Sequence, residues 1–232
     1  MKRIVLVDDH PIYCDGLARL IESDKGLRVC GMAGDVQEAL KLAEETSPDL
    51  VIADISLPGR NGLELVKDLV AAHPGIPVIV LSMHDEMVYA ERVLRAGARA
   101  YVMKDEPPDR LLEAVRVVLH GGVFASRTVT NHLLHSLSSG KATLKGKAKP
   151  SFPLERLTDR EMEVFELIGQ AMSNHEIAAR LGISPRTLDA HRAHIREKLG
   201  LGDGGELTRH AIRWVEVGAL SGSGSAGKHA SD

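Results

Sequence analysis

The sequence has 232 residues, enough for one large domain or two domains of ordinary size. Hydrophobic residues make up 44% and charged residues 26%, and no apolar run approaches the ~18 residues that a membrane span needs, so we expect a globular protein with no membrane partner. The net charge of −3 excludes a uniformly basic nucleic-acid-binding protein, but it leaves room for a local binding face.

The first 125 residues alternate short β-rich apolar runs with longer amphipathic stretches. The apolar runs predict strands at 3–7, 27–33, 49–53, 77–82 and 99–103. Helical spacing of apolar residues predicts helices at 16–23, 36–45, 62–72, 87–97 and 110–122. Five strands alternating with five helices predict a parallel sheet covered on both faces. Right-handed crossovers make this a doubly wound α/β domain.

The character of the sequence changes after Phe124. A possible short helix at 126–137 leads into a segment rich in Gly, Ser, Pro and Lys, and we interpret 126–154 as a linker. Helical patterning without strands then predicts a second, all-α domain over 155–220. The last residues, 221–232, are small and polar and are predicted to be disordered.

The N-terminal residues and the cysteines indicate a cytoplasmic protein. Asp8 and Asp9 follow the start of the chain too soon for the apolar core of a signal peptide. The only two cysteines, Cys14 and Cys30, are predicted to be reduced thiols rather than a disulfide or metal ligands.

Polar side chains follow four of the five predicted strands. Because parallel strands end at the same edge of a sheet, and ligands bind outside those ends, we expect these side chains to form one site. Any one of them alone would be interpreted as a helix cap, a turn residue or a solvated charge. The residues are Asp8 and Asp9 after the first strand, Asp54 after the third, Ser82 after the fourth and Lys104 after the fifth.

The residue types in this set favour phosphoryl chemistry. Three neighbouring carboxylates repel one another unless a cation joins them, and Mg²⁺ takes one or two carboxylates together with waters and phosphate oxygens. One carboxylate can then attack a phosphoryl group, while an ammonium group neutralises its oxygens and a hydroxyl donates a hydrogen bond. The set suits the formation and hydrolysis of an acyl phosphate.

These motifs resemble the receiver domain of two-component response regulators. The resemblance is carried by "VDDH", "DISLPGRNGLEL", "VIVLSMHD" and "AYVMKDEP", which together reach four of the five strands. It implies a flavodoxin-like receiver over 1–125 with Asp54 as the phosphoacceptor. The further roles that it implies are Mg²⁺ binding by Asp9, Asp54 and the backbone carbonyl of Ser56, a water-mediated role for Asp8, and phosphoryl contacts from Ser82 and Lys104.

Two positions of the receiver-like segment leave alternatives open. Tyr101 lies where the family places an aromatic residue that changes rotamer on activation, but a half-buried strand aromatic fits the pattern equally well. Asp105 follows Lys104 where many receivers have proline, so the cis peptide bond common in the family is not predicted here.

The second domain contains helix-start signals. Thr158 and Glu161 predict a capping box, and Asn174 precedes a helix that ends at Gly182. Ser184 then opens another helix as its N-cap. Two helices joined by a short turn containing glycine predict a helix-turn-helix, although ordinary helical hairpins share this pattern.

The second helix of this pair carries the candidate DNA-reading face. Leu188 and Ile195 define its buried side. A charged helix face is usually only solvated, but the helix-turn-helix pattern favours a face that reads DNA. The residues assigned to it are Arg186, Thr187, Asp189, Ala190, Arg192, Ala193 and Arg196.

This stretch resembles the LuxR-type helix-turn-helix of NarL/FixJ response regulators. The matching motifs are "LTDRE", "NHEIAARLGIS" and "TLDAHRAHIREKLGL". The resemblance implies double-stranded DNA as a partner, with His191 either partly buried or approaching the DNA backbone. The sequence departs from the family at Asp189, where Lys is frequent, and in the glycine-rich "GDGGE" before the last helix.

The two domains together indicate a DNA-binding transcriptional response regulator. A partner histidine kinase would phosphorylate Asp54, and phosphorylation would control DNA binding or dimerisation, with a homodimer expected in the phosphorylated or DNA-bound form. Such a protein is not an enzyme beyond self-phosphorylation from small donors and self-dephosphorylation. The alternatives are a receiver-controlled adaptor that binds protein, and an aspartyl-nucleophile phosphatase. The phosphatase is less favoured because "DDH" is not a D-x-D motif and no cap insertion is evident.

Overall fold

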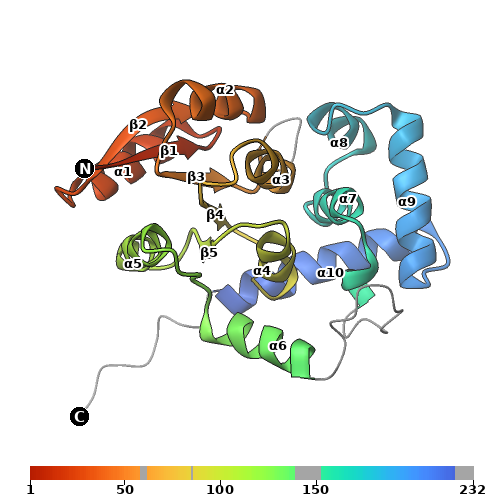
Figure 1. Ribbon diagram of the computed structural model, residues 1–232. Coiled ribbons are helices and arrows are strands. Elements are labelled where there is room, and N and C mark those ends of the chain that lie inside the picture. The colour runs from red at the N-terminus through yellow and green to blue at the C-terminus, as the bar shows by residue number, and fades with distance from the viewer. Residues whose placement is uncertain (58–61, 85, 139–152, 223–232) are drawn as a thin grey trace, which may run out of the picture. The chain divides into compact units, whose positions relative to one another are not determined.

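The computed structural model describes residues 1–57, 62–84, 86–138 and 153–222 (Figure 1). The chain divides into two compact units, Met1–Ala148 and Lys149–Asp232. Residues 139–152 of the predicted linker and residues 223–232 of the predicted tail lie outside the described residues. Within the described part of the chain, no helix is both long enough and apolar enough to cross a membrane.

The first unit contains a five-stranded parallel sheet in the order β2-β1-β3-β4-β5. This is the flavodoxin-like order, and it confirms the predicted doubly wound fold. The strands are β1 (Lys2–Val7), β2 (Leu27–Ala33), β3 (Leu50–Asp54), β4 (Val78–Ser82) and β5 (Ala100–Met103). The helices are α1 (Pro11–Glu22), α2 (Val36–Thr46), α3 (Gly62–Ala72), α4 (Glu86–Arg95), α5 (Pro108–Leu119) and α6 (Arg127–Ser138).

The sheet is buried on both faces, which explains why its strands appear as continuous apolar runs. Ile4 and Leu6 of β1 pack in one core cluster with residues of α1 and α5. Val5 and Val7, which alternate with these residues along β1, point to the opposite face and are also buried. Because helices cover both faces of the sheet, polar groups can gather only at the ends of its central strands.

Helix α3 begins in close contact with the end of β3. The amide of Gly62 donates a hydrogen bond to the carbonyl of Ile55 at 2.8 Å. A β-carbon at position 62 would overlap the carbonyl oxygen of Asp54 and lie 2.7 Å from the α-carbon of Ile55. Only glycine permits this approach of helix to strand.

The helix expected at 126–137 is present as α6, and it contacts α4 within the first unit. Its Val129 is buried, and Phe124 just before it is buried too. The guanidinium of Arg110 lies 4.6 Å from the centre of the Phe124 ring. The residues from Phe124 to the end of α6 at Ser138 therefore pack within the first unit.

Every secondary-structure element among the described residues of the second unit is a helix, as predicted. Met162 and Phe165 are fully buried in its core together with Ile177, Leu188 and Ile195. Gly182 has a φ of +61° in the turn between the two helices of the predicted helix-turn-helix. The elements are the 3₁₀ helix η1 (Pro153–Arg156) and the helices α7 (Asp159–Gly169), α8 (Asn174–Arg180), α9 (Pro185–Leu199) and α10 (Gly204–Gly222).

Capping residues fix the starts of α7 and α8. The capping box of Thr158 and Glu161 is confirmed at α7. At α8 the prediction is wrong by one residue, because Asn174 is the first helical residue and Ser173 is the N-cap. The Ser173 hydroxyl accepts a bond from the amide of Glu176, whose carboxylate accepts one from the Ser173 amide. This reciprocal pair satisfies two amides that a cap at Asn174 would leave open.

Candidate functional site

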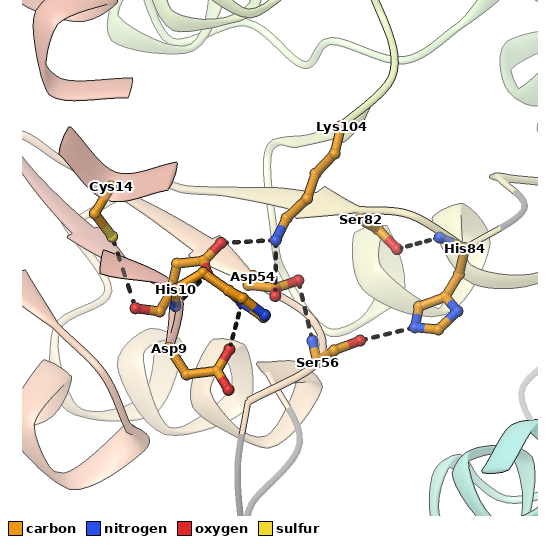
Figure 2. Close-up of polar contacts among 9 residues, drawn as sticks. Asp9, His10, Cys14, Asp54, Ser56, Ser82, His84 and Lys104 are labelled. Atoms are coloured by element: carbon orange, nitrogen blue, oxygen red, sulfur yellow. Dashed lines mark hydrogen bonds and ion pairs between the residues drawn. The ribbon is translucent and has the colours of Figure 1, made fainter. Parts of the chain in front are cut away.

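The polar residues at the strand ends meet at one edge of the sheet (Figure 2). The Nζ atom of Lys104 lies 2.6 Å from Oδ2 of Asp8 and 2.9 Å from Oδ2 of Asp54. Both carboxylates are buried, with Asp8 5% and Asp54 4% exposed. The ring of Tyr13 in α1 places its centre 4.6 Å from the same Nζ atom. One ammonium, on a side chain that is 10% exposed, thus compensates two buried carboxylates.

Burial and charge set the protonation of this cluster. Burial raises the pKa of the Asp54 carboxyl above its ordinary value, and the hydrogen bond and charge of Lys104 only partly oppose this. Burial pulls the pKa of the Lys104 ammonium down, but the hydrogen bonds and charges of Asp54 and Asp8 outweigh burial and leave that pKa raised. Lys104 therefore stays protonated at neutral pH, and Asp54 is a more basic carboxylate than an exposed aspartate.

Two serines flank Asp54. The amide of Ser56 donates a hydrogen bond to Oδ1 of Asp54 at 3.1 Å. Ser82 is fully buried at the end of β4, and its hydroxyl oxygen accepts a bond from the amide of His84 at 2.9 Å. Accepting this bond does not consume the hydroxyl hydrogen, which Ser82 can donate to a group at Asp54.

Two histidines that the sequence does not predict as site residues lie at this edge. Nδ1 of His10 is 2.9 Å from Oδ1 of Asp9 and 3.1 Å from Oδ1 of Asp8. Nε2 of His84 is 2.8 Å from the hydroxyl of Ser56. Each histidine follows a strand end within three residues, which places it near this edge but does not determine where its side chain points.

Tyr101 is tied to the segment after β4. Its hydroxyl donates a hydrogen bond to the carbonyl of His84 at 2.7 Å, and the residue is 4% exposed. The His84 ring in turn packs against Tyr89 of α4, with ring centres 5.1 Å apart. Tyr101 is thus a fully buried strand aromatic, and its role as a rotamer switch stays a prediction.

The same edge offers ligands for a cation. Ligand atoms of Asp8, Asp9, His10 and Asp54 all lie within 4.8 Å of one another. A hard divalent cation prefers the carboxylate oxygens of the three aspartates, and Mg²⁺ needs only one or two carboxylates beside its waters. The three carboxylates therefore fit the ion that the sequence predicts, whereas His10 offers a nitrogen donor.

The residues of the predicted DNA-reading face all lie on α9. Leu188 and Ile195 are fully buried on the opposite side of the helix. Nη1 of Arg192 donates a hydrogen bond to Oδ1 of Asn174, the first residue of α8, at 3.0 Å. The exposed members are Arg186, Thr187, Asp189, Ala190 and Ala193, and the partly exposed members are Arg192 and Arg196.

His191 of α9 takes the partly buried alternative in this structure. Burial and, next, the charge of Arg160 lower the pKa of its imidazole. The ring is therefore neutral at pH 7 and is a weak candidate for binding a phosphate.

Comparison with known proteins covers both units. Residues 4–116 match the response regulator receiver domain, and residues 155–211 match the bacterial regulatory proteins of the luxR family. The transcriptional regulatory protein DegU of Brevibacillus brevis is 33% identical over 226 residues, covering 93% of this chain and 95% of DegU. The chain belongs to the response regulators. The oxygen regulatory protein NreC of Staphylococcus aureus is 32% identical over 212 residues, covering 91% of this response regulator and 97% of NreC.

Solved structures agree with this assignment. RcsB from Salmonella enterica serovar Typhimurium, bound to promoter rprA with a phosphomimetic, gives a TM-score of 0.64 at 23% identity. The match covers 91% of this chain and 98% of RcsB, and at that identity it shows the fold. A LuxR-family response regulator from Aurantimonas sp. SI85-9A1 is 33% identical with a TM-score of 0.53, over 62% of this chain and 99% of that one. The response regulator thus combines a receiver domain with a LuxR-type DNA-binding domain.

The DNA-binding domain of this response regulator contains a buried carboxylate paired with a partly exposed lysine, and the loss of this pair should be costly. Glu161 is 3% exposed, and its Oε2 lies 2.5 Å from Nζ of Lys198. Burial raises the pKa of Glu161, but its bonds to Lys198 and Thr158 outweigh burial and leave that pKa lowered. A lowered carboxyl pKa means that the pair stabilises the fold above the ordinary glutamate value of about 4.3, and that this stability is lost as pH falls through the lower folded value.

We expect Glu161→Gln to lower the free energy of unfolding of this domain by about 1.5–3 kcal/mol at pH 7, the range for bonds to charged groups. The loss should shrink as pH falls below about 4. Urea unfolding followed by fluorescence of Trp214 measures it, because this only tryptophan packs on Phe165 in the domain core.

The matched control is Glu176→Gln. Glu176 holds the same position in the capping box of α8 but is exposed, and glutamine can replace glutamate in such a box. Its substitution should leave the unfolding midpoint nearly unchanged. Equal losses from both substitutions would contradict a special role for the Lys198 pair.

Proposed function

We propose that this response regulator controls transcription by binding DNA, and that a partner histidine kinase sets its activity by phosphorylating Asp54. The observation that carries the proposal is the edge at which Lys104 lies within 2.9 Å of two buried carboxylates. In the same chain, a helix-turn-helix exposes one face of α9. The relative DegU is itself named a transcriptional regulatory protein.

In the proposed reaction, a carboxylate oxygen of Asp54 attacks the phosphorus of the kinase's phosphohistidine. A P–O bond forms, the P–N bond breaks, and the histidine leaves. Lys104 and Ser82 bind the transferred phosphoryl oxygens. Mg²⁺, when bound, supplies positive charge to these oxygens. The groups proposed to hold it are Asp9, Asp54 and the carbonyl of Ser56, with Asp8 acting through water.

The acyl phosphate would then act as a switch. It adds negative charge beside Ser82, whose hydroxyl is bonded to the amide of His84. The carbonyl of His84 is bonded to Tyr101, so a shift at Ser82 bears on the Tyr101 hydrogen bond. We propose that this shifts a pre-existing equilibrium toward DNA binding or homodimerisation. Water later hydrolyses the acyl phosphate, so the protein acts as a phosphoacceptor rather than as an enzyme with a separate substrate. The proposed location is the cytoplasm.

The experiment that tests this function is the selection of bound DNA. Full-length protein is incubated with fragmented genomic DNA, with and without a beryllofluoride phosphate mimic, and the retained fragments are sequenced. A shared sequence motif that is enriched more strongly with the mimic supports the proposal. Failure to enrich any sequence in either condition would favour the adaptor that binds protein through its helical domain.

Two residues of α9 are expected to affect DNA binding differently. Asp189 lies early on the recognition helix, where such helices meet base edges, and an acidic side chain there can accept a bond from the amino group of cytosine. Asp189→Ala should relax the preference at one base position by about 1–3 kcal/mol. Arg192→Ala should weaken binding to all sequences alike and reduce the salt dependence by about one ion per protomer.

Binding to a randomised half-site library at two salt concentrations separates these effects. Glu197→Ala is the matched control, because Glu197 is an exposed acidic residue near the other end of α9 and should not alter base preference. An unchanged preference in Asp189→Ala would contradict the base-reading role.

A further inference from the structure

His10 has no role in the function proposed above, although its ring lies against the carboxylates of the candidate cation site (Figure 2). Its Nδ1 atom is 2.9 Å from Oδ1 of Asp9 and 3.1 Å from Oδ1 of Asp8. The side chain is 69% exposed, so it is not held there as part of the core. Core packing therefore does not account for the contact between His10 and the two aspartates, and the polar groups at the sheet edge must account for it.

The backbone directs His10 toward this edge. His10 is the N-cap residue of α1 with φ −106° and ψ 96°, and its side chain makes no capping bond. Pro11 follows as the first helical residue, with a restricted φ and no N–H to cap. The amide of His10 instead donates a bond to Oδ1 of Asp8 at 2.9 Å. Both the backbone and the ring of His10 are thus bound to the paired aspartates.

The distances fit neighbouring ligands of a single ion. An octahedral cation with bonds of about 2.1 Å places adjacent ligand atoms about 3.0 Å apart. His10 Nδ1 is 2.9 Å from Oδ1 of Asp9, a direct ligand in the proposed site, and Asp54 contributes a further atom to a group that spans 4.8 Å. A proton on Nδ1 produces the same spacing without any ion. The choice of metal ion, rather than the spacing of the atoms, distinguishes a metal-bound His10 from one that is hydrogen-bonded to the carboxylates.

We propose that Nδ1 of His10 is a ligand of the divalent cation at this edge, and that the site therefore prefers a first-row transition ion to Mg²⁺. The inference rests on the proposed function, since the cation is the one that phosphorylation of Asp54 requires. Imidazole nitrogen binds the later first-row divalent ions well, whereas Mg²⁺ selects oxygen and gains little from a nitrogen donor. His10 would thus set which metal the receiver takes.

Calorimetric titration of the full-length protein with CoCl₂ and with MgCl₂ tests the preference. In wild type, Co²⁺ should bind more tightly than Mg²⁺. His10→Ala should weaken Co²⁺ binding by about tenfold or more, while Mg²⁺ affinity changes less than about twofold. His120→Ala is the matched control, because His120 is an exposed histidine at the C-terminal end of α5 in the same unit. It should leave both affinities unchanged.

Proton NMR of the protein with one equivalent of Co²⁺ tests direct coordination. A cobalt-bound imidazole has a hyperfine-shifted exchangeable N–H resonance, which a purely electrostatic effect of His10 would not produce. The resonance should be present in wild type and in His120→Ala and absent in His10→Ala.

The outcomes separate this inference from the proposed function. If His10→Ala weakens both ions equally, or if it keeps the shifted resonance, the inference is overturned, while Mg²⁺-dependent phosphorylation of Asp54 stands. If neither ion binds wild type, both the inference and the cation requirement of the proposed function are overturned.

Discussion

Asp54→Asn should abolish the phosphoryl adduct that the wild-type protein takes from a small donor such as acetyl phosphate. Asparagine keeps the size of the side chain but removes the anionic oxygen that attacks phosphorus. Burial leaves that carboxylate more basic than an exposed one, and Lys104 lies 2.9 Å from it, where it can also contact an incoming phosphoryl group. Intact-mass measurement should show one adduct on wild type with Mg²⁺ and none on the variant.

The matched control is Asp105→Asn, which removes an exposed carboxylate directly after Lys104. This variant should keep the full adduct. Chelation of divalent ions should remove the wild-type adduct, because the cation offsets the negative charge of the reacting groups. A full adduct on Asp54→Asn would place the phosphoacceptor at another residue.

Lys104→Met should lower the free energy of unfolding of the receiver unit by about 3–5 kcal/mol, the cost of removing one partner from a buried charge pair. Methionine fills a similar volume, but it leaves Asp8 and Asp54 buried without their ammonium partner. Hydrogen exchange of the amides of β3 and β4 measures the loss in this unit. Added Mg²⁺ should stabilise the variant more than the wild type, because the cation supplies the missing charge.

Lys2→Met provides the comparison for this substitution. Lys2 lies 2.8 Å from Asp49, but the two side chains are 53% and 32% exposed, so the loss of this pair should cost less than about 1 kcal/mol. Equal hydrogen exchange in Lys104→Met and wild type would show that the two buried carboxylates do not depend on the ammonium group.

The sheet edge could be predicted because a simple rule connects sequence to position. Apolar runs predict strands, parallel strands end at one edge, and the residue after each run is therefore placed without knowledge of side-chain geometry. Asp8, Asp54 and Lys104 follow this rule and are in contact. His10 and His84 do not, because each lies in the segment beyond a strand end, where the turn rather than the strand determines where a side chain points.

Helix starts show a second limit of sequence patterns. Ser173 and Asn174 are both good N-cap residues and are adjacent, so residue preference does not decide between them. The reciprocal bonds between Ser173 and Glu176 fix the helix start one residue earlier than predicted. Similarly, the pattern of α9 predicts which side is buried, but it does not predict the bond from Arg192 to Asn174, which joins two helices.

The packing of Gly62 against the backbone of Asp54 and Ile55 has a consequence for how mutations would be tolerated. Backbone atoms cannot rotate away as the end of a long side chain can, so even one methyl group forces α3 off the strand. A random-mutagenesis screen for lost signalling would therefore recover substitutions at a residue with no functional group. The allowed residue at position 62 is selected by volume alone, whereas at Asp54 it is selected by reactivity.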